Sequence, residues 1–333
     1  MEIVIGDIHG SIHQFVFPFT SHGFATGFNI KNNEIEFEEL DLHGYRLIFL
    51  GDIFYKGEYD CIIANTLSRL ILDNYEIEWL LGNRDLIVFA KLFKENLEID
   101  DTSHSYKDSP FIDRYNSLNK ERLKRLIIEK KLKVITRLKN NILVSHAAIT
   151  QKGFNELKNI LETKIINNIN PDIRNINQLT LTKDNQLDSI EDLNNIFNDI
   201  DNINLYCSHL EIFWNKHIFE SIEESIIGHE TFINEYPKNA IVKIQKYGIW
   251  LTDEYISMNV QCKQDRIKQF LLKEVHYGDI IIKTNIHHID CNCFDNPCCF
   301  ILNNNKWSYS GQDDKLSFSD YEFNGRTYKV IST

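Results

Sequence analysis

The sequence predicts an α/β fold, and three features of the chain support this prediction. Short apolar runs recur along the first two thirds of the chain and have the length and composition of buried β-strands. Each run ends at a short polar motif. Charged segments with helical spacing lie between some of the runs, and the last third is rich in apolar or alternating stretches typical of strands. The five apolar runs are Glu2–Ile5, Leu47–Leu50, Ile77–Leu81, Ile142–Val144 and Ile226–Ile227.

The polar motifs that follow these runs have the composition of a metal site. They are Gly6-Asp7-Ile8-His9-Gly10, Gly51-Asp52, Gly82-Asn83, His146 and His229. Because open α/β sheets place ligand groups beyond the carboxyl ends of their strands, we expect these side chains to converge. One residue separates Asp7 from His9, so both side chains point the same way in an extended segment. Carboxylate, imidazole and amide groups without a thiolate favour Mn, Fe or Zn.

The order of these motifs, D-x-H, GD, GN, H and GH, resembles the calcineurin-like metallophosphoesterase superfamily. Leu50–Gly57 and Leu81–Leu86 are most similar to the phosphoprotein phosphatases and to bacterial enzymes that split dinucleoside polyphosphates such as diadenosine tetraphosphate. The resemblance covers residues 1–90 and 142–150 well and 205–255 loosely. It implies a two-sheet β-sandwich flanked by helices, a four-layer α/β/β/α arrangement with helical inserts.

The resemblance also implies a role for each motif residue. The implied ligands of a first metal ion are Asp7, His9 and Asp52. The implied ligands of a second ion are Asp52, Asn83, His146 and His229. Two divalent ions, with Mn favoured over Fe or Zn, would depress the pKa of a bridging water, and the resulting hydroxide would attack phosphorus in line. Asp52 is therefore expected to be catalytic as well as metal-binding.

Two motifs depart from the family pattern. The family's GNH motif contains a histidine that protonates the leaving oxygen, and Arg84 stands in its place. The aspartate and arginine of the family's GD-x-x-D-R-G motif are replaced by Tyr55 and Lys56. Arginine cannot donate a proton, since its pKa exceeds about 12, but its planar fork can hold phosphate oxygens. We therefore expect Arg84 and Lys56 to be catalytic, phosphate-binding residues, and His13, Tyr55 and His43 remain candidates for the proton donor.

The missing acid changes which substrates the site can cleave. General acid catalysis contributes about 10²–10⁴-fold, and a phenolate or phosphate leaving group needs it less than a serine alkoxide does. The superfamily's pyrophosphatase for UDP-diacylglucosamine also carries Gly-Asn-Arg-Asp, so the arginine is compatible with activity. We expect a protein phosphatase that favours phosphotyrosine over phosphoserine. The alternatives are a dinucleoside polyphosphate or pyrophosphate hydrolase, and a degenerate metal-binding interaction module without turnover.

The chain is expected to form a single domain, residues 1–333, because ligands from both of its halves must share one site. Two inserts with helical patterns interrupt it, at 92–140 and 154–204. In the first insert, an amphipathic run begins at Asn119 and continues through Leu132. The inserts are expected to form either a helical cap over the metal site or a surface elaboration.

Residues 240–333 are expected to supply the second sheet and the C-terminal region. Strands are predicted at Ala240–Ile244, Tyr247–Leu251 and Asp279–Lys283, and a helix at 260–278. A cysteine cluster follows, beside His287 and His288. Its members are Cys291, Cys293, Cys298 and Cys299. Their spacing lacks the paired pattern of zinc sites, so we favour reduced cysteines in a strand and turn over a zinc site.

The composition indicates a soluble, cytoplasmic enzyme. The chain has 333 residues, 43% of them hydrophobic, and can bury a large core. Its formal charge of −12 argues against binding to nucleic acid. No apolar stretch approaches the length of a membrane span, and little room precedes Asp7 for a cleaved signal. The expected partner is a phosphorylated protein or a small phosphorylated substrate, and delivery into another cell stays open.

Overall fold

The computed structural model describes residues 1–54, 57–93 and 115–147, together with Asn155, Asn194 and the strands from residue 225 onward. The helices are α1 (Ile12–Ser21), α2 (Asp60–Leu72), α3 (Asn83–Phe93) and α5 (Lys120–Ile128). The first strands are β1 (Glu2–Ile5), β2 (Gly27–Lys31), β3 (Glu34–Glu38), β4 (Arg46–Phe49), β5 (Ile77–Trp79), β6 (Ile135–Arg137) and β7 (Leu143–Ser145). The later strands are β8 (Ser225–Ile227), β9 (Lys243–Gln245), β10 (Gly248–Trp250), β11 (Glu274–Tyr277), β12 (Ile280–Lys283), β13 (Ile286–His288), β14 (Cys298–Asn303), β15 (Lys306–Gly311), β16 (Phe318–Phe323) and β17 (Arg326–Ile331). The predicted mixture of helices and sheets is confirmed.

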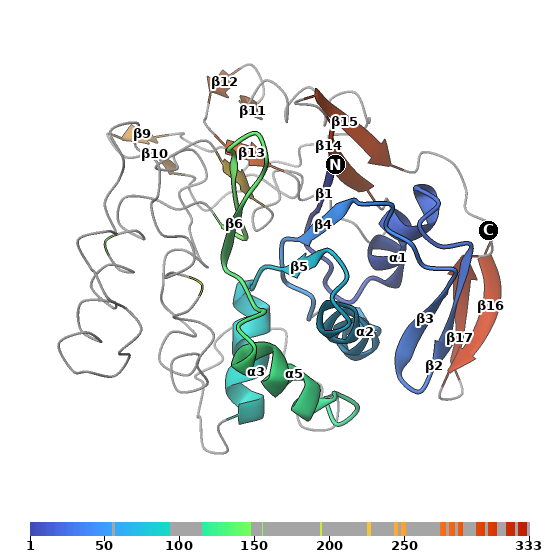
Figure 1. Cartoon of the computed structure of the whole chain (residues 1–333). Helices are drawn as coiled ribbons and strands as arrows, with labels where there is room; N and C mark the ends of the chain where they lie inside the picture. Colours follow the sequence, from blue (N-terminus) through green and yellow to red (C-terminus); the bar gives the residue numbers. More distant parts are fainter. Residues whose placement is uncertain are drawn as a thin grey trace.

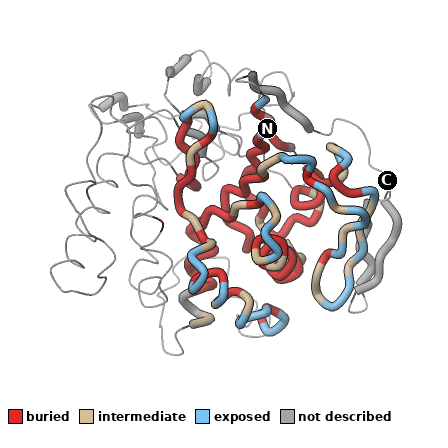
Figure 2. The backbone as a smooth tube through the Cα atoms, viewed as in Figure 1, coloured by how far each residue is buried: buried red, intermediate tan, exposed pale blue. Residues whose placement is uncertain are grey.

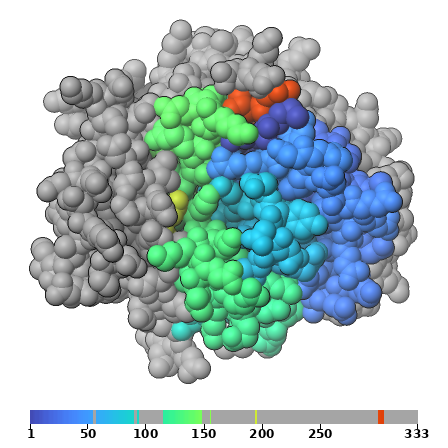
Figure 3. Space-filling view, in the orientation of Figure 1, coloured from blue at the N-terminus to red at the C-terminus, as the bar shows by residue number. Residues whose placement is uncertain are grey.

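A five-stranded sheet with the order β15-β14-β1-β4-β5 lies at the centre of the described fold. β1, β4 and β5 are parallel, with Val4 opposite Ile48 and Phe49 opposite Trp79. β14 pairs antiparallel with β1 and places Phe300 opposite Val4. Segments about 300 residues apart in sequence therefore meet in one sheet, and in Figure 3 the visible part of the β14 segment lies beside the first residues of the chain.

The two faces of this sheet pack against different partners, because successive side chains of a strand point in opposite directions. One face shares a core with α1 and α2 through Ile3, Ile5, Leu47 and Phe49. The other face packs on the second sheet through Val4 and Ile48, which meet Val144 of β7. Helices, central sheet and second sheet form three successive layers (Figure 1). The outer helical layer of the predicted sandwich falls outside the described residues.

The second sheet has four strands in the order β13-β8-β7-β6. β8 is parallel to both of its neighbours, β13 and β7, whereas β6 is antiparallel to β7. A parallel bridge between Leu80 and Lys133 joins the end of β5 to the segment that leads into β6. The Leu81 N–H donates to the Lys133 carbonyl there at 2.7 Å. The two sheets are thus connected beside the loop that carries Asn83.

The strands predicted before each metal motif are confirmed, with ends that differ by at most two residues. In the last third of the chain, β13 joins the second sheet, whereas β14 and β15 extend the central sheet, where Phe300 and Leu302 cover the same apolar cluster as Val4. One expectation for this region needs correction. The helix expected at 260–278 is wrong for Glu274–Tyr277, which forms β11 and pairs with β12. Valine and tyrosine in this segment favour a strand.

α5 begins where the sequence predicts. The Asn119 side chain caps it by accepting the Arg122 N–H at 3.0 Å. Leu123 and Leu126 enter the large core, and the Arg122 guanidinium donates to the Asn65 carbonyl of α2 at 2.9 Å. The described end of the first insert therefore belongs to the core of the domain.

Burial is concentrated in the central strands and the helices that cover them. β1 and most of β4 and α2 are fully buried, whereas the β2–β3 hairpin is largely half-buried or exposed (Figure 2). Among the helices of the described residues, none combines the length and the apolar character needed to cross a bilayer.

Candidate metal centre

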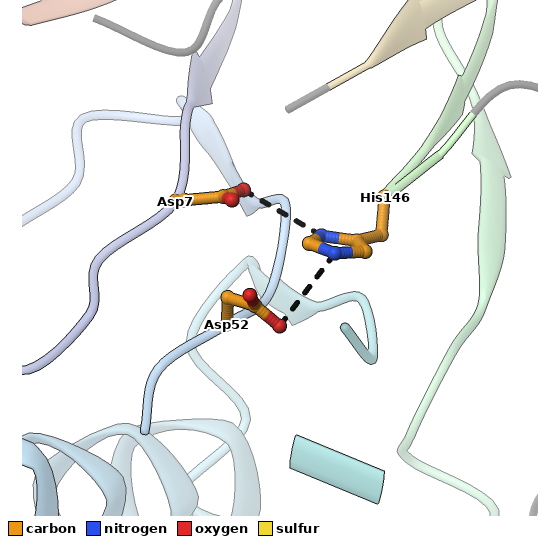
Figure 4. Close-up of side chains that lie close together, drawn as sticks. All are labelled: Asp7, Asp52 and His146. Carbon is orange, nitrogen blue, oxygen red and sulfur yellow. Dashed lines mark ion pairs between the residues drawn. The ribbon is translucent and has the colours of Figure 1, made fainter. Parts of the chain in front are cut away.

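Three of the predicted ligands follow neighbouring parallel strands. Asp7 lies two residues after β1, Asp52 three residues after β4, and Asn83 four residues after β5. Because the carboxyl ends of parallel strands lie at one edge of a sheet, the three loops meet there. His146 follows β7 of the second sheet and reaches the same place from the other side (Figure 4).

The loops that carry Asp7 and Asp52 run side by side. Three backbone hydrogen bonds join them: His9 N–H to the Asp52 carbonyl (2.6 Å), Gly10 N–H to the Ile53 carbonyl (2.8 Å) and Gly57 N–H to the His9 carbonyl (2.7 Å). A backbone ladder of this kind fixes the separation of the two loops before any side chain is considered.

Glycines allow the ligand loops to approach so closely. A Cβ atom at Gly10 would lie 2.8 Å from the Gly57 carbonyl oxygen, and one at Gly51 would lie 2.6 Å from the Leu80 carbonyl oxygen. A Cβ at Gly82 would lie 2.5 Å from the Asp52 nitrogen. Any side chain at these positions would push the loops apart.

Asp7, Asp52 and His146 form a buried cluster. One ligand atom from each lies within 4.8 Å of the others. The His146 ring is 3.5 Å from Asp7 Oδ1 through Nδ1 and 3.5 Å from Asp52 Oδ1 through Nε2 (Figure 4). The three residues are at most 2% exposed, so charge on them is shielded little by solvent.

The orientation of His146 suits a metal ligand. Its Nδ1 lies 2.8 Å from the Leu50 carbonyl oxygen, which can only accept, so Nδ1 donates there. In the neutral ring Nε2 then carries the lone pair, and Nε2 is the atom that faces Asp52 and Asn83. A backbone carbonyl that orients the other ring nitrogen is the usual support of a metal-binding histidine.

Asn83 and His9 lie beside this cluster. Asn83 Oδ1 lies 3.1 Å from His146 Nε2 and 3.0 and 3.2 Å from the two Asp52 carboxylate oxygens. The Asn83 oxygen thus faces other acceptors, which repel it. A cation bound among these acceptors would relieve the repulsion, and so would rotation of the amide so that its nitrogen donates to Asp52. His9 lies 3.7 Å from Asp7 and 3.9 Å from Asp52. Carboxylates, imidazoles and an amide oxygen fit Mn, Fe or Zn.

The electrostatics of the cluster favour positive charge. Burial opposes a charge on the His146 ring, but the carboxylates of Asp52 and Asp7 outweigh it and raise the pKa of His146 to about 10. Burial, followed by the charge of Asp52, raises the pKa of Asp85 to about 7. Two carboxylates held together away from water thus stabilise a cation between them.

The other predicted residues are placed as follows. Arg84 lies in the first turn of α3, and its backbone N–H donates to Asp52 Oδ1 at 2.9 Å. His43 is exposed and pairs with Asp41 at 3.2 Å, and His13 lies on α1. Tyr55, Lys56 and His229 fall outside the described residues.

The cysteine cluster is described only in part. Cys298 and Cys299 lie in β14, as expected of cysteines in a strand, and Cys299 is a buried free thiol. Its Sγ lies 3.4 Å from Nε2 of His22. Burial raises the pKa of this thiol strongly, which favours the neutral form. Cys291 and Cys293 fall outside the described residues.

Asp85 was not singled out from the sequence. Its carboxylate binds the backbone of two ligand loops, at Ile53 (2.8 Å) and Gly82 (3.0 Å), and the indole of Trp79 (3.0 Å). The sequence feature that could have identified Asp85 is its position, because it is an acidic residue two positions after Asn83 and lies in the first turn of a helix.

Comparisons with known proteins give remote similarities. No protein-family model matches the chain, and no curated protein matches it. Among solved structures, it is similar to a protein serine/threonine phosphatase from Saccharomyces cerevisiae with similarity to human phosphatase PP5, with 19% identity, a TM-score of 0.29 and 46% of this chain covered. The match spans 39% of the length of that phosphatase. Two structures of a cold-active protein-tyrosine phosphatase of a psychrophilic Shewanella have 13% identity each, TM-scores of 0.31 and 0.30, and cover 74% of this chain and 69% and 68% of their own.

Proposed function

We propose that this protein is a metal-dependent phosphoester hydrolase. The observation that carries the proposal is the convergence within 4.8 Å of Asp7 and Asp52, which follow the parallel strands β1 and β4, with His146, which follows β7 of the second sheet. The order of the sequence motifs supports the same activity. Divalent ions bound there, with Mn favoured, would supply Lewis-acid activation of water and of phosphate oxygens.

The proposed ligand sets divide the cluster between two ions. Asp7 and His9 would hold the first ion, and Asn83, His146 and His229 the second. Asp52 would contact both, and its carboxylate lies near His9 on one side and His146 on the other, at 3.9 and 3.5 Å. The Leu50 carbonyl would keep His146 in the tautomer that binds metal.

Arg84 and Lys56 are the proposed phosphate-binding residues. Arg84 lies in the first turn of α3, directly after a proposed ligand, and its N–H bond to Asp52 keeps this end of the helix against the cluster. The N-terminal end of a helix carries partial positive charge and favours an anion. A guanidinium at this position would stabilise charge on the transferred phosphoryl group, whereas it would not protonate a leaving group.

The proposed substrate is a phosphorylated protein, with phosphotyrosine favoured over phosphoserine. Without a histidine beside Asn83, cleavage depends on a leaving group that departs as an anion. A phenolate, with a conjugate-acid pKa near 10, does so far more readily than an alkoxide. A pyrophosphate-linked substrate such as a dinucleoside polyphosphate satisfies the same condition and is the second candidate.

One set of assays tests the proposal. The Mn²⁺-loaded protein is compared on p-nitrophenyl phosphate, a phosphotyrosine peptide, a phosphoserine peptide and diadenosine tetraphosphate. We expect metal-dependent turnover that is faster on phosphotyrosine than on phosphoserine. Asp52→Asn should lower it by more than about 100-fold, since the loss of a residue that only orients a ligand already costs roughly 10–100-fold.

The controls separate the alternatives. Asp41→Asn makes the same chemical change at an exposed aspartate and should keep wild-type turnover. Arg84→His should raise the rate on phosphoserine more than on phosphotyrosine, because it restores a proton donor. Equal rates on the two peptides would contradict the leaving-group argument. No turnover on any substrate would favour the metal-binding interaction module.

A further inference from the structure

Asp85 is a completely buried carboxylate whose oxygens bind donors from the loop after β4, from the end of β5 and from the loop after β5. Its Oδ1 accepts the N–H of Ile53 at 2.8 Å and that of Phe54 at 3.4 Å. Its Oδ2 accepts the N–H of Gly82 and the indole N–H of Trp79, each at 3.0 Å. Both oxygens therefore accept two hydrogen bonds each, which uses the full acceptor capacity of a carboxylate.

Two of these segments carry proposed metal ligands. Ile53 directly follows Asp52, and Gly82 directly precedes Asn83. One side chain thus ties together the backbones of the two ligand loops. The indole donor anchors this arrangement in the core, because Trp79 is fully buried and its ring centroid lies 6.1 Å from that of Phe54.

Helix capping accounts for only part of these contacts. Asp85 stands three residues after Gly82, the residue before α3, and its bond to the Gly82 N–H is the return half of a capping box. That bond needs a single oxygen. The other oxygen binds Ile53 and Phe54, which belong to a different loop and gain nothing from the capping of α3.

We propose that Asp85 is a positioning residue that holds the Asp52 and Asn83 loops at the separation required for metal binding. The inference rests on the proposed metal centre, which it extends to a residue that would not contact the ions. An amide cannot replace the carboxylate, because it offers one acceptor oxygen and turns two N–H donors toward backbone N–H groups. Asp85→Asn should therefore release one of the two loops.

The test measures the Mn²⁺ dissociation constant of the full chain by calorimetry, together with the melting temperature of the metal-free protein. We expect Asp85→Asn to raise the dissociation constant by about 10–100-fold, the usual effect of losing a residue that orients a ligand. Trp79→Phe removes one donor and leaves both loop contacts, so it should cause a smaller increase. The visible absorption of bound Co²⁺ should also change in Asp85→Asn, because the ligand geometry differs.

Glu2→Gln is the matched control. Glu2 is also a buried carboxylate that accepts two donors, from Arg46 and from the Lys139 backbone, but it lies at the opposite end of β1 from Asp7. It should lower the melting temperature without changing the Mn²⁺ dissociation constant.

If Asp85→Asn behaves like Glu2→Gln, the carboxylate is merely structural and the proposal is wrong. If Asp85→Asn does not fold, the same measurements are made on Asp85→Glu, which keeps the charge but displaces the carboxylate from the Ile53 and Gly82 N–H groups by one methylene. An unchanged dissociation constant and Co²⁺ spectrum in that variant refutes the proposal. A wild-type chain that binds no Mn²⁺ refutes the metal centre itself, whereas Mn²⁺ binding without turnover refutes only the hydrolase.

Discussion

Two proposed ligands have a backbone conformation that L-amino acids rarely adopt. The φ angle is 47° at His9 and 46° at Asp52. A left-handed residue other than glycine costs about 1–2 kcal/mol, somewhat less for aspartate. The short bond between the His9 N–H and the Asp52 carbonyl holds both residues in place. Strain of this kind clusters at functional sites, so it supports the site independently of the side-chain distances.

A pair of glycine substitutions tests whether close contact between the ligand loops matters. Gly10 and Gly23 have similar φ angles, 71° and 67°, so alanine brings the same backbone strain to both. A Cβ at Gly23 meets nothing within 4 Å, whereas one at Gly10 meets the Gly57 backbone at 2.8–3.0 Å. We expect Gly23→Ala to lower the free energy of unfolding by about 1–2 kcal/mol and to leave Mn²⁺ affinity unchanged.

Gly10→Ala should lower the free energy of unfolding further and weaken Mn²⁺ binding, because it separates the loops of Asp7 and Asp52. Denaturant unfolding and calorimetric titration measure the two effects. Equal losses for the two variants would mean that the contact between Gly10 and Gly57 contributes nothing beyond backbone strain.

At the scale of elements, a charged network joins the strands at the end of the sheet opposite the metal centre. Arg46 of β4 donates to Glu2 of β1 and to Glu78 of β5, each at 2.7 Å. Lys133, which leads into β6, also pairs with Glu78. Glu2 in turn accepts the Lys139 N–H at 2.9 Å. Three strands of the central sheet and the hairpin of the second sheet are therefore linked by one set of charges.

The stability that this network contributes should depend on pH. Burial would raise the pKa of Glu78, but Arg46 and Lys133 outweigh it and hold the pKa below its usual value of 4.5. A carboxylate with a depressed pKa in the folded state stabilises the fold above its unfolded pKa, and this contribution disappears as the pH falls through the folded pKa. Glu78→Gln should lower the free energy of unfolding at pH 7 by about 2–3 kcal/mol, as expected for hydrogen bonds to a charged group.

The difference between wild type and Glu78→Gln should shrink as the pH falls below about 4.5. Urea unfolding at several pH values measures it. Glu129→Gln is the control, since Glu129 pairs with Arg125 at the surface of α5 at 2.9 Å and such a pair contributes only about 0.3–0.5 kcal/mol. A difference that stays constant from pH 7 to pH 3 would show that the charge of Glu78 is irrelevant.

Local signals in the sequence predict the elements well. The strands that precede Asp7, Asp52 and His146 are apolar runs bounded by glycine or polar residues, and Asn119 marks the start of α5 by its capping side chain. The pairing of β14 with β1 could not be predicted, because alternation identifies a strand but not its neighbour. Asp85 can be recognised in the sequence as an acidic residue near the start of a helix. Its hydrogen bond to Ile53 could not be predicted, because it depends on a contact between two loops that are distant in sequence.

For the whole molecule, that distant pairing places a C-terminal strand beside the strand that leads to Asp7, so the N-terminal part of the proposed metal centre should depend on the C-terminal region. β1 leads directly to Asp7 and lies between β4 and β14. Removal of β14 would leave β1 as an edge strand with Val4 uncovered, and Phe300 and Leu302, each 3% exposed, would be lost from the cluster between the sheets. An uncovered apolar edge strand promotes association with other chains.

We therefore expect a chain that ends at residue 297 to lose cooperative unfolding or solubility. Burial of a side chain such as Phe300 or Leu302 contributes about 1.5–3 kcal/mol, so the pair amounts to roughly 3–6 kcal/mol of a total stability of about 5–15 kcal/mol. A chain that ends at residue 317 is the control, because it keeps β14 and β15 and removes β16 and β17, which pair with each other. Circular dichroism during heating and the soluble yield distinguish the two chains. If the chain of residues 1–297 unfolds cooperatively at the temperature of the longer one and binds Mn²⁺ equally well, the sheet around Asp7 does not depend on β14.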